Sequence, residues 1–335
     1  AGHATRIDSV LRGLGKRTLM WGDIILEHPE ILDMIPPDVI LGAWNYDAAE
    51  SFAGFIDPLK GAGFDFTVSP GVLNSNRLIP DFRMATTNIR NFINEGYEKG
   101  TVGVYCTVWD DGGMHFFNHT WYGVAYSAEQ SWRPNREPLD QFDRRFSRGI
   151  YGDQQNLIPR ALHALNHLTD LGPTFEMNHN VFDKTIVPDR GDKVTFDPGS
   201  WEEVERWVQE SRKILTGGYT PWYDQDLAFI KFTLSQYKFL IDSRNELLKA
   251  AGAFNEASRL QRNDREAALE KLMESRDIIG SLRMQYAAVR SEFSILWDLE
   301  SRAYWKDRAL MDYDVHMEGF NDQMDLLEEA ITEFH

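Results

Sequence analysis

The chain has a single cysteine, Cys106, among its 335 residues, so it cannot form an intramolecular disulfide, and its cysteine usage does not identify a compartment. No apolar run reaches the about 18 residues of a membrane-spanning helix, so we expect no membrane span. Lysine and arginine number 35 against 52 aspartates and glutamates, a formal net charge of −17. Because such a chain repels phosphate backbones and shows no local basic patch, we expect no nucleic-acid partner. With 42% hydrophobic and 26% charged residues, the composition is that of a globular protein.

Short runs rich in β-branched and aromatic residues are concentrated in residues 1–150, and strong turn signals follow the last two. These strand candidates cover residues 17–21, 38–44, 64–69 and 102–109. Helical patterns lie between them, over residues 4–14, 48–61 and 84–98. Nearly continuous apolar strands that alternate with helices are typical of parallel sheets, so this part of the chain is predicted to have an α/β fold.

Beyond residue 150 the strand signals nearly vanish and helical periodicity dominates. Amphipathic helices are predicted over residues 157–171, 200–216, 224–251, 265–280, 282–308 and 315–335. The break between the fourth and fifth of these falls at Gly280, and residues 173–199 are expected to form a long loop. Cys106 lies within the last strand candidate, where we expect it to be buried.

Three of the strand candidates end with a tryptophan followed two residues later by a polar or aromatic side chain, which a strand places on the same face. The pairs are Trp21 with Asp23, Trp44 with Tyr46, and Trp109 with Asp111. In parallel α/β folds the carboxyl ends of the strands carry the active site, so these side chains are predicted to converge at one opening. Flat aromatic walls with carboxylate acceptors suit sugars. The alternative is that the tryptophans fill the core and the carboxylates only begin loops.

The same segments resemble glycoside hydrolase family 20, the β-N-acetylhexosaminidases. The similarity lies in "GKRTLMWGDIILEHPEILDMIPPDVILGAWNYD" (residues 15–47), "SPGVLNSNRLIPDFRMATTNIRNF" (69–92) and "GVYCTVWDDGG" (103–113). The resemblance implies that residues 1–153 are the second half of a (β/α)8 TIM-type barrel, strands five to eight. Residues 154–335 would form an all-α helical C-terminal domain.

The resemblance also implies an activity: substrate-assisted, retaining hydrolysis of terminal β-linked N-acetylglucosamine or N-acetylgalactosamine, without a metal or an organic cofactor. In this mechanism the acetamido oxygen of the sugar attacks the anomeric carbon, an exception to the two-carboxylate scheme. By position, the three pocket indoles of the family correspond to Trp21, Trp44 and Trp109. Asp111 corresponds to the residue that accepts hydrogen bonds from the sugar hydroxyls.

Two departures from the family pattern stand out. The catalytic Asp-Glu pair is absent, because no Asp-Glu dipeptide occurs in the chain, and by the resemblance it would lie before Ala1. The tyrosine that many relatives carry at the end of strand seven is also missing from the Thr67–Pro70 segment; Asn74 or Asn76 could approach the sugar there.

Four strands alone would leave an open sheet edge, so we expect a partner: the N-terminal half of the barrel, or a second copy that closes the sheet. One alternative function is a non-catalytic module that binds carbohydrate or protein. Another is a different glycosidase that uses Asp23 and Asp111 as its carboxylate pair. The pair His115 and His119 is too weak a signal to predict a metal site.

Overall fold

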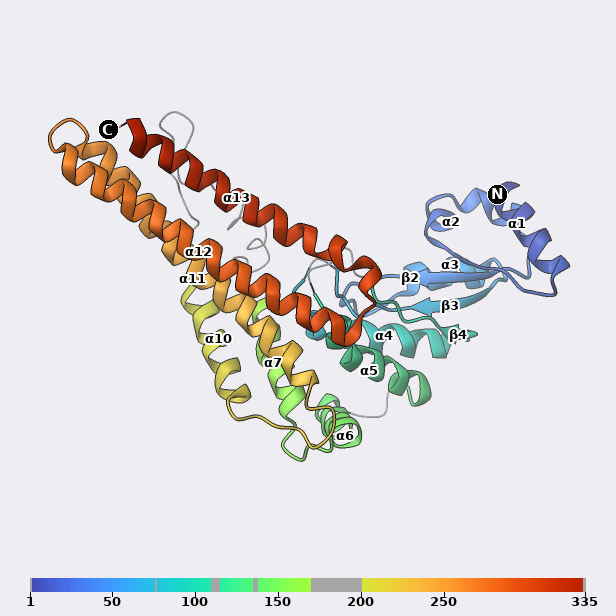
Figure 1. The fold of residues 1–335 in the computed structure, drawn as a ribbon. Helices are drawn as coiled ribbons and strands as arrows, with labels where there is room; N and C mark the ends of the chain where they lie inside the picture. The colour runs from blue at the N-terminus through green and yellow to red at the C-terminus, as the bar shows by residue number, and fades with distance from the viewer. Residues whose placement is uncertain (1, 76, 110–114, 135–137, 170–200, 334–335) are drawn as a thin grey trace. The chain divides into compact units, whose positions relative to one another are not determined.

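The computed structural model describes residues 2–75, 77–109, 115–134, 138–169 and 201–333. These residues form an α/β structure that is mostly helical and contains a small parallel sheet (Figure 1). The chain divides into two compact units. The first comprises Ala1–Gly112 and His119–Pro159, and the second comprises Gly113–Asn118 and Arg160–His335.

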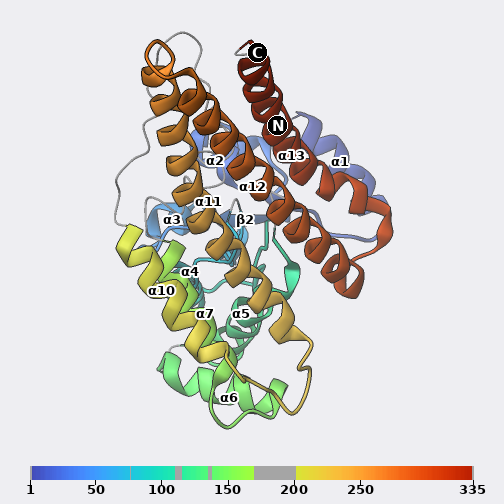
Figure 2. The ribbon, with the colours of Figure 1, turned by 60° about the vertical axis from the view of Figure 1, so that its left-hand side comes forward.

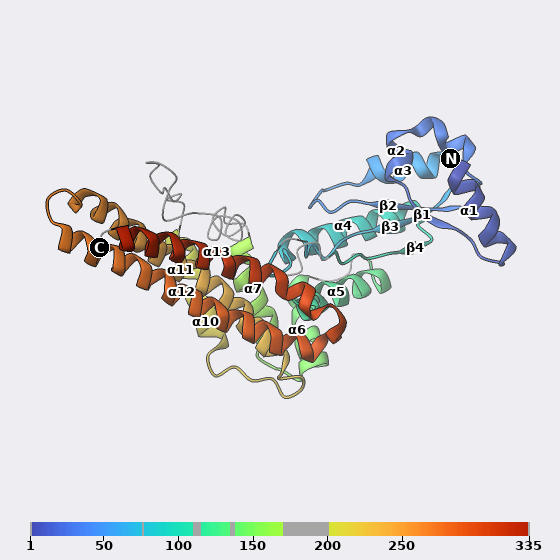
Figure 3. The same cartoon turned by 45° about the horizontal axis from the view of Figure 1, so that its top comes forward.

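The sheet of the first unit contains four parallel strands, as the sequence predicted, and their order is β1-β2-β3-β4 (Figure 3). They are shorter than the predicted runs: β1 (Leu19–Trp21), β2 (Ile40–Trp44), β3 (Asp65–Ser69) and β4 (Gly103–Val104). Beyond the ends of β3 and β4, the two segments pair again in one isolated parallel bridge between Gly71 and Thr107. Pro70, which has no N–H group to donate, lies at this interruption.

Cys106 corrects one expectation, because it lies in the irregular stretch after β4 and is only partly buried. Burial nevertheless raises the pKa of its thiol above the ordinary value.

Helices alternate with the strands up to β4, as predicted for an α/β fold. They are α1 (Gly2–Gly13), α2 (Asp23–Glu27), α3 (Ala53–Gly61) and α4 (Phe82–Lys99), with a short 3-10 turn η1 (Pro29–Met34) before β2. A 3-10 turn η2 (Phe117–Thr120) and the helices α5 (Trp121–Trp132) and α6 (Leu139–Tyr151) follow β4. The Asp81 side chain caps α4 by accepting a hydrogen bond from Met84 N (3.1 Å), and Gly100 ends the helix with φ 87°. Helix α7 (Leu157–Thr169) crosses the boundary between the units.

One face of the sheet packs against α3 and α4 (Figure 1). Leu41 of β2 and Val68 of β3 are fully buried there, in one hydrophobic cluster with Ile56 of α3 and Phe92 of α4. Side chains alternate between the faces of a strand, so the neighbours of Leu41 and Val68 point to the opposite face. That second face carries most of the residues that concern function.

The second unit is a bundle of long helices: α10 (Trp201–Leu215), α11 (Asp226–Leu260), α12 (Arg265–Glu300) and α13 (Lys306–Glu333), with a short 3-10 turn η4 (Ala303–Trp305) before α13. Helix α12 packs against both α11 and α13 along their length (Figure 2). Fully buried aromatic side chains such as Phe293 and Tyr313 fill the contact, with ring centroids 4.9 Å apart.

The predicted helix break at Gly280 is wrong, because α12 continues through it as one helix of 36 residues. A glycine inside a helix costs about 1 kcal/mol relative to alanine. Here the position faces Met324 of α13, whose Cε would lie 3.7 Å from an added Cβ. Packing between long helices therefore overrides the local preference of the glycine.

In the described part of the chain, no helix is both long and apolar enough to cross a membrane.

Candidate functional site

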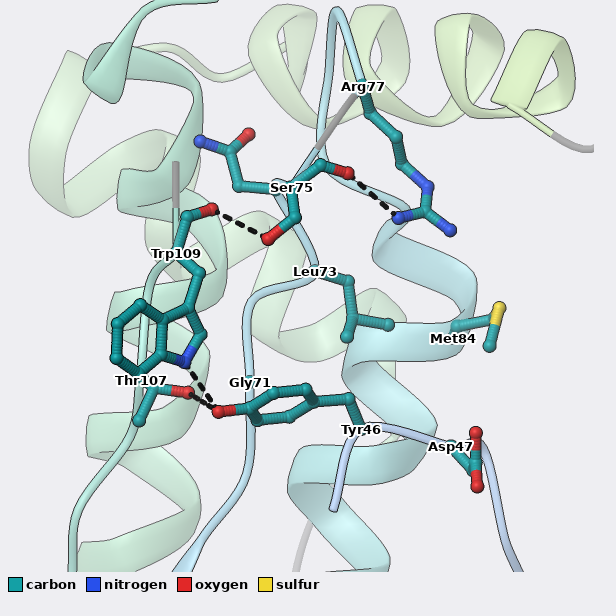
Figure 4. Close-up of a pocket in the computed structure, with 10 residues that line it drawn as sticks. Tyr46, Asp47, Gly71, Leu73, Ser75, Arg77, Met84, Thr107 and Trp109 are labelled. Atoms are coloured by element: carbon teal, nitrogen blue, oxygen red, sulfur yellow. Dashed lines mark hydrogen bonds between the residues drawn. The ribbon is translucent and has the colours of Figure 1, made fainter. Parts of the chain in front are cut away.

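Hydrogen bonds join the segments that follow three of the strands (Figure 4). Trp109 Nε1 donates to the hydroxyl of Tyr46 at 2.6 Å, and the hydroxyls of Tyr46 and Thr107 are hydrogen-bonded at 3.0 Å. The Thr107 hydroxyl also lies 3.3 Å from the carbonyl oxygen of Pro70, which can only accept. Because Tyr46 follows β2, Pro70 follows β3 and Thr107 follows β4, the network fixes all three segments relative to one another.

Tyr46 is held by its own loop. The side chain of Asn45 accepts a hydrogen bond from Asp47 N at 2.9 Å, a turn typical of asparagine. The ring of Tyr46 lies directly over Gly71, where an added Cβ would come within 2.6 Å of Tyr46 Cδ1. Glycine is therefore required at position 71 for the tyrosine to take this place.

The side chain of Asn88, on α4, forms hydrogen bonds with the loop that carries Tyr46 and with the loop that carries Gly71. It is fully buried, and its amide nitrogen donates to the carbonyl oxygens of Asn45 (2.9 Å) and Asp47 (2.8 Å). Its amide oxygen accepts from Gly71 N at 3.1 Å. One buried side chain thus holds the backbone on both sides of Tyr46 and the glycine beneath its ring.

These loops enclose a cavity of about 220 Å³ in the first unit. Ligand pockets for drug-sized molecules hold about 300–1,000 Å³, so this one suits a small ligand. Its lining mixes aromatic, aliphatic and polar side chains: Tyr46, Asp47, Gly71, Leu73, Asn74, Ser75, Arg77, Met84, Thr107 and Trp109 (Figure 4).

The polar side of the cavity belongs to the loop after β3. Ser75 Oγ donates to the backbone carbonyl of Trp109 at 3.1 Å, and Arg77 Nη1 donates to the carbonyl of Ser75 at 3.3 Å. Asn74 is 1% exposed, and within the described part of the chain its amide oxygen has no hydrogen-bond partner. Asp47 and Arg77 carry the charges among the lining residues.

The residues singled out in the sequence fall in different places. Tyr46 and Trp109 line the cavity together. Trp44 packs on Tyr46, with ring centroids 5.1 Å apart, and 36% of it is exposed. Trp21 instead meets Tyr105 edge-on, and Asp23 begins α2; neither is among the lining residues.

Asn76 and Asp111 lie outside the described residues, as do Asp110 and residues 112–114.

Sequence reasoning missed Thr107, Arg77 and Asn88. Thr107 precedes Trp109 by two residues, so the same-face rule that paired the other residues would have found it. Arg77 and Asn88 carry no comparable signal in the sequence.

A scan against models of known protein families finds no match for this chain, and a search of curated protein sequences finds none either. Within the described residues, no group of three or more His, Cys, Asp or Glu side chains is placed to hold a metal ion. The site defined here is thus a small aromatic and polar pocket at the carboxyl ends of parallel strands, where α/β folds bind ligands.

Proposed function

We propose that this chain supplies the sugar-binding part of a catalytic barrel of the β-N-acetylhexosaminidase type, glycoside hydrolase family 20. The observation that carries the proposal is the shared position of Tyr46 and Trp109, joined by a 2.6 Å hydrogen bond, in one pocket beyond the carboxyl ends of the strands. Both residues belong to the segments that carry the family resemblance.

The chemistry of the pocket suits a neutral sugar. The indole of Trp109 is 47% exposed and offers a flat apolar surface to the C–H face of a pyranose ring. The surrounding hydroxyl and amide groups, from Tyr46, Thr107 and Asn74, can exchange hydrogen bonds with sugar hydroxyls. Because Trp109, Tyr46 and Thr107 are held by hydrogen bonds to one another, little ordering of this wall is needed on binding.

In a substrate-assisted mechanism, walls of this kind align the acetamido group with the anomeric carbon and exclude water. Trp44 and Trp109 would form such walls, and Asp111 would accept hydrogen bonds from the sugar hydroxyls. The proton donor would be the glutamate of an Asp-Glu pair, which this sequence does not contain. On this proposal the pair comes from another polypeptide segment.

An aromatic contact across one face of the sheet supports its assignment to a barrel. Strands β1 and β4 are separated by three strand spacings, so side chains pointing straight out from a flat sheet would lie about 14 Å apart. Yet the ring centroids of Trp21 and Tyr105 are 5.9 Å apart. The indole of Trp21 lies over Gly42 of β2, where an added Cβ would come within 3.0 Å of it. Trp21 of β1 and Tyr105, just after β4, thus reach toward each other over this face, as side chains inside a barrel do.

Exposed apolar side chains support a partner that completes the barrel. Parallel sheets are normally covered on both faces, but Leu19, Trp44 and Tyr105 on this face are 41%, 36% and 55% exposed. In the segment before β1, Val10 of α1 and Leu14 just after it are 65% and 69% exposed. We infer that a βα segment packs beside β1, from an N-terminal barrel half or from a second copy of this chain.

A titration of the purified chain with methyl β-N-acetylglucosaminide, followed by calorimetry, tests the proposal. Wild-type protein is expected to bind in the millimolar range or tighter, and Trp109→Ala to bind at least tenfold more weakly, since it removes the stacking surface. Exposed Trp132 provides a matched control, and Trp132→Ala is expected to bind as wild type does. Heat release that is absent in the wild type, or unchanged in Trp109→Ala, would contradict the proposal.

A non-catalytic sugar-binding module is the second candidate. The described residues that line the pocket include one carboxylate, that of Asp47, whereas most glycosidases use a pair. This favours binding without catalysis. Hydrolysis of a chromogenic β-N-acetylglucosaminide after mixing with a separately produced family 20 N-terminal barrel half distinguishes the two. Turnover that depends on Trp109 supports the enzyme, and sugar binding without turnover supports the module.

A further inference from the structure

Asn74 has an unusual environment for a buried amide. It is 1% exposed, it lines the cavity beside Tyr46 and Trp109, and its Oδ1 has no hydrogen-bond partner among the described residues. Buried polar side-chain atoms are nearly always hydrogen-bonded, so an orphaned one in a pocket requires an explanation.

The backbone, not the side chain, holds Asn74 in place. Its carbonyl accepts from Arg77 N at 3.3 Å, and the preceding residue, Leu73, has φ 61° and accepts from Asp81 N at 3.2 Å. Positive φ is costly for leucine, and such strain is often found where a loop presents a ligand-binding group. The next residue, Ser75, is tethered to the carbonyl of Trp109. The loop is thus held by its backbone, while Oδ1 of Asn74 has no partner in the described part of the structure.

We propose that Asn74 is a specificity-determining residue of this pocket, and that its amide binds a neutral hydrogen-bonding substituent of the ligand. A side-chain amide offers an acceptor and two donors without charge, which matches a hydroxyl or an acetamido group. The inference rests on the proposed function, and it assigns to Asn74 the recognition of a ring substituent of the bound sugar.

The same reasoning predicts that removing the Asn74 amide weakens ligand binding but stabilises the free protein. An unpaired buried amide lowers the stability of the free protein, because its lost hydration is not replaced. Asn74→Leu, which keeps the branched shape and removes both polar atoms, is therefore expected to raise the melting temperature while it weakens binding. A purely structural asparagine would behave in the opposite way.

Asn91 provides the matched control. It lies on α4 in the same unit, and its amide donates to the carbonyl of Ala49 at 2.8 Å. Asn91→Leu breaks that bond, so it is expected to lower the melting temperature and to leave sugar affinity unchanged. Asn74→Ala serves as a second variant in case leucine does not fit the pocket.

The experiment is a calorimetric titration of wild type, Asn74→Leu, Asn74→Ala and Asn91→Leu with methyl β-N-acetylglucosaminide and with methyl β-glucoside, together with thermal melts. We expect about tenfold weaker binding for both Asn74 variants, with no fall in the melting temperature. A loss confined to the acetamido sugar assigns the contact to that group, and an equal loss for both sugars assigns it to a ring hydroxyl.

Wild-type affinity in the Asn74 variants would overturn this inference and leave the proposed function standing. A fall in the melting temperature as large as that of Asn91→Leu would also overturn it, because Asn74 would then be a structural residue. Failure of the wild type to bind either sugar would instead overturn the proposed function.

Discussion

Replacing Asn88 by alanine is expected to destabilise the first unit strongly. The substitution removes three hydrogen bonds of 2.8–3.1 Å from a fully buried position. Each is worth about 1 kcal/mol net, and leaving buried backbone groups unpaired adds to the loss. We therefore expect a decrease of about 3–5 kcal/mol in the free energy of unfolding, which is large for one side chain.

Asn91→Ala is a matched comparison on the same helix, because it removes one partly buried hydrogen bond, to the carbonyl of Ala49, and one exposed hydrogen bond, from Arg90 Nε. Its expected cost is about 1 kcal/mol. Because the chain has two compact units, a measurement confined to the first gives the magnitude of this cost most directly. Urea-dependent hydrogen exchange, read by mass spectrometry on peptides covering residues 40–71, reports on the loops that Asn88 joins.

The result that refutes this reasoning is an Asn88→Ala protein no less stable in these peptides than Asn91→Ala. The three hydrogen bonds of the fully buried Asn88 would then contribute no more to the free energy of unfolding than those of Asn91. If the account is right, exchange protection is lost on both sides of Tyr46 together, because one side chain holds both loops.

Gly71→Ala is expected to displace the Tyr46 ring, because the new Cβ would lie 2.6 Å from it, and to cost about 1–3 kcal/mol in urea melts; an unchanged melt would contradict this. Trp109→Phe removes the indole donor to Tyr46 and should weaken sugar binding by about three- to tenfold in calorimetry, whereas Trp132→Phe should not. Burial and the neighbouring Asp143 raise the pKa of Tyr122 above its usual 10.0. Its stabilising effect is thus complete below pH about 10 and declines at higher pH, so urea unfolding should show a steeper loss of stability from pH 9 to 11 than in Tyr122→Phe, and equal slopes would contradict this.

The sheet could be predicted from the sequence because its strands are short apolar runs with clear stops. The short extent of β4 could not be predicted, since its pairing is interrupted at Pro70, which follows the neighbouring strand β3. The helix break predicted at Gly280 was wrong for a similar reason, because contact between α12 and α13 outweighs the low helix propensity of glycine. In both cases a tertiary contact decides what the local pattern leaves open.

In the candidate site, too, the residues set by the local pattern could be predicted and those set by tertiary contacts could not. Tyr46 and Trp109 were visible in the sequence because residues two apart at strand ends share a face. The part played by Asn88 was not, because a buried asparagine in the middle of a helix gives no sign of which loops it will meet. Trp21 is absent from the cavity lining because its indole lies over Gly42 and meets Tyr105, two contacts between different strands that the local sequence does not reveal.

The central claim is that the pocket beside Trp109 and Tyr46 binds a β-linked N-acetylamino sugar. Saturation-transfer difference NMR on the full chain with methyl β-N-acetylglucosaminide tests this most directly. The account predicts transfer to the ring protons on the face that stacks on the indole, and its loss in Trp109→Ala. Absence of transfer in the wild type, or equal transfer in wild type and Trp109→Ala, would contradict it.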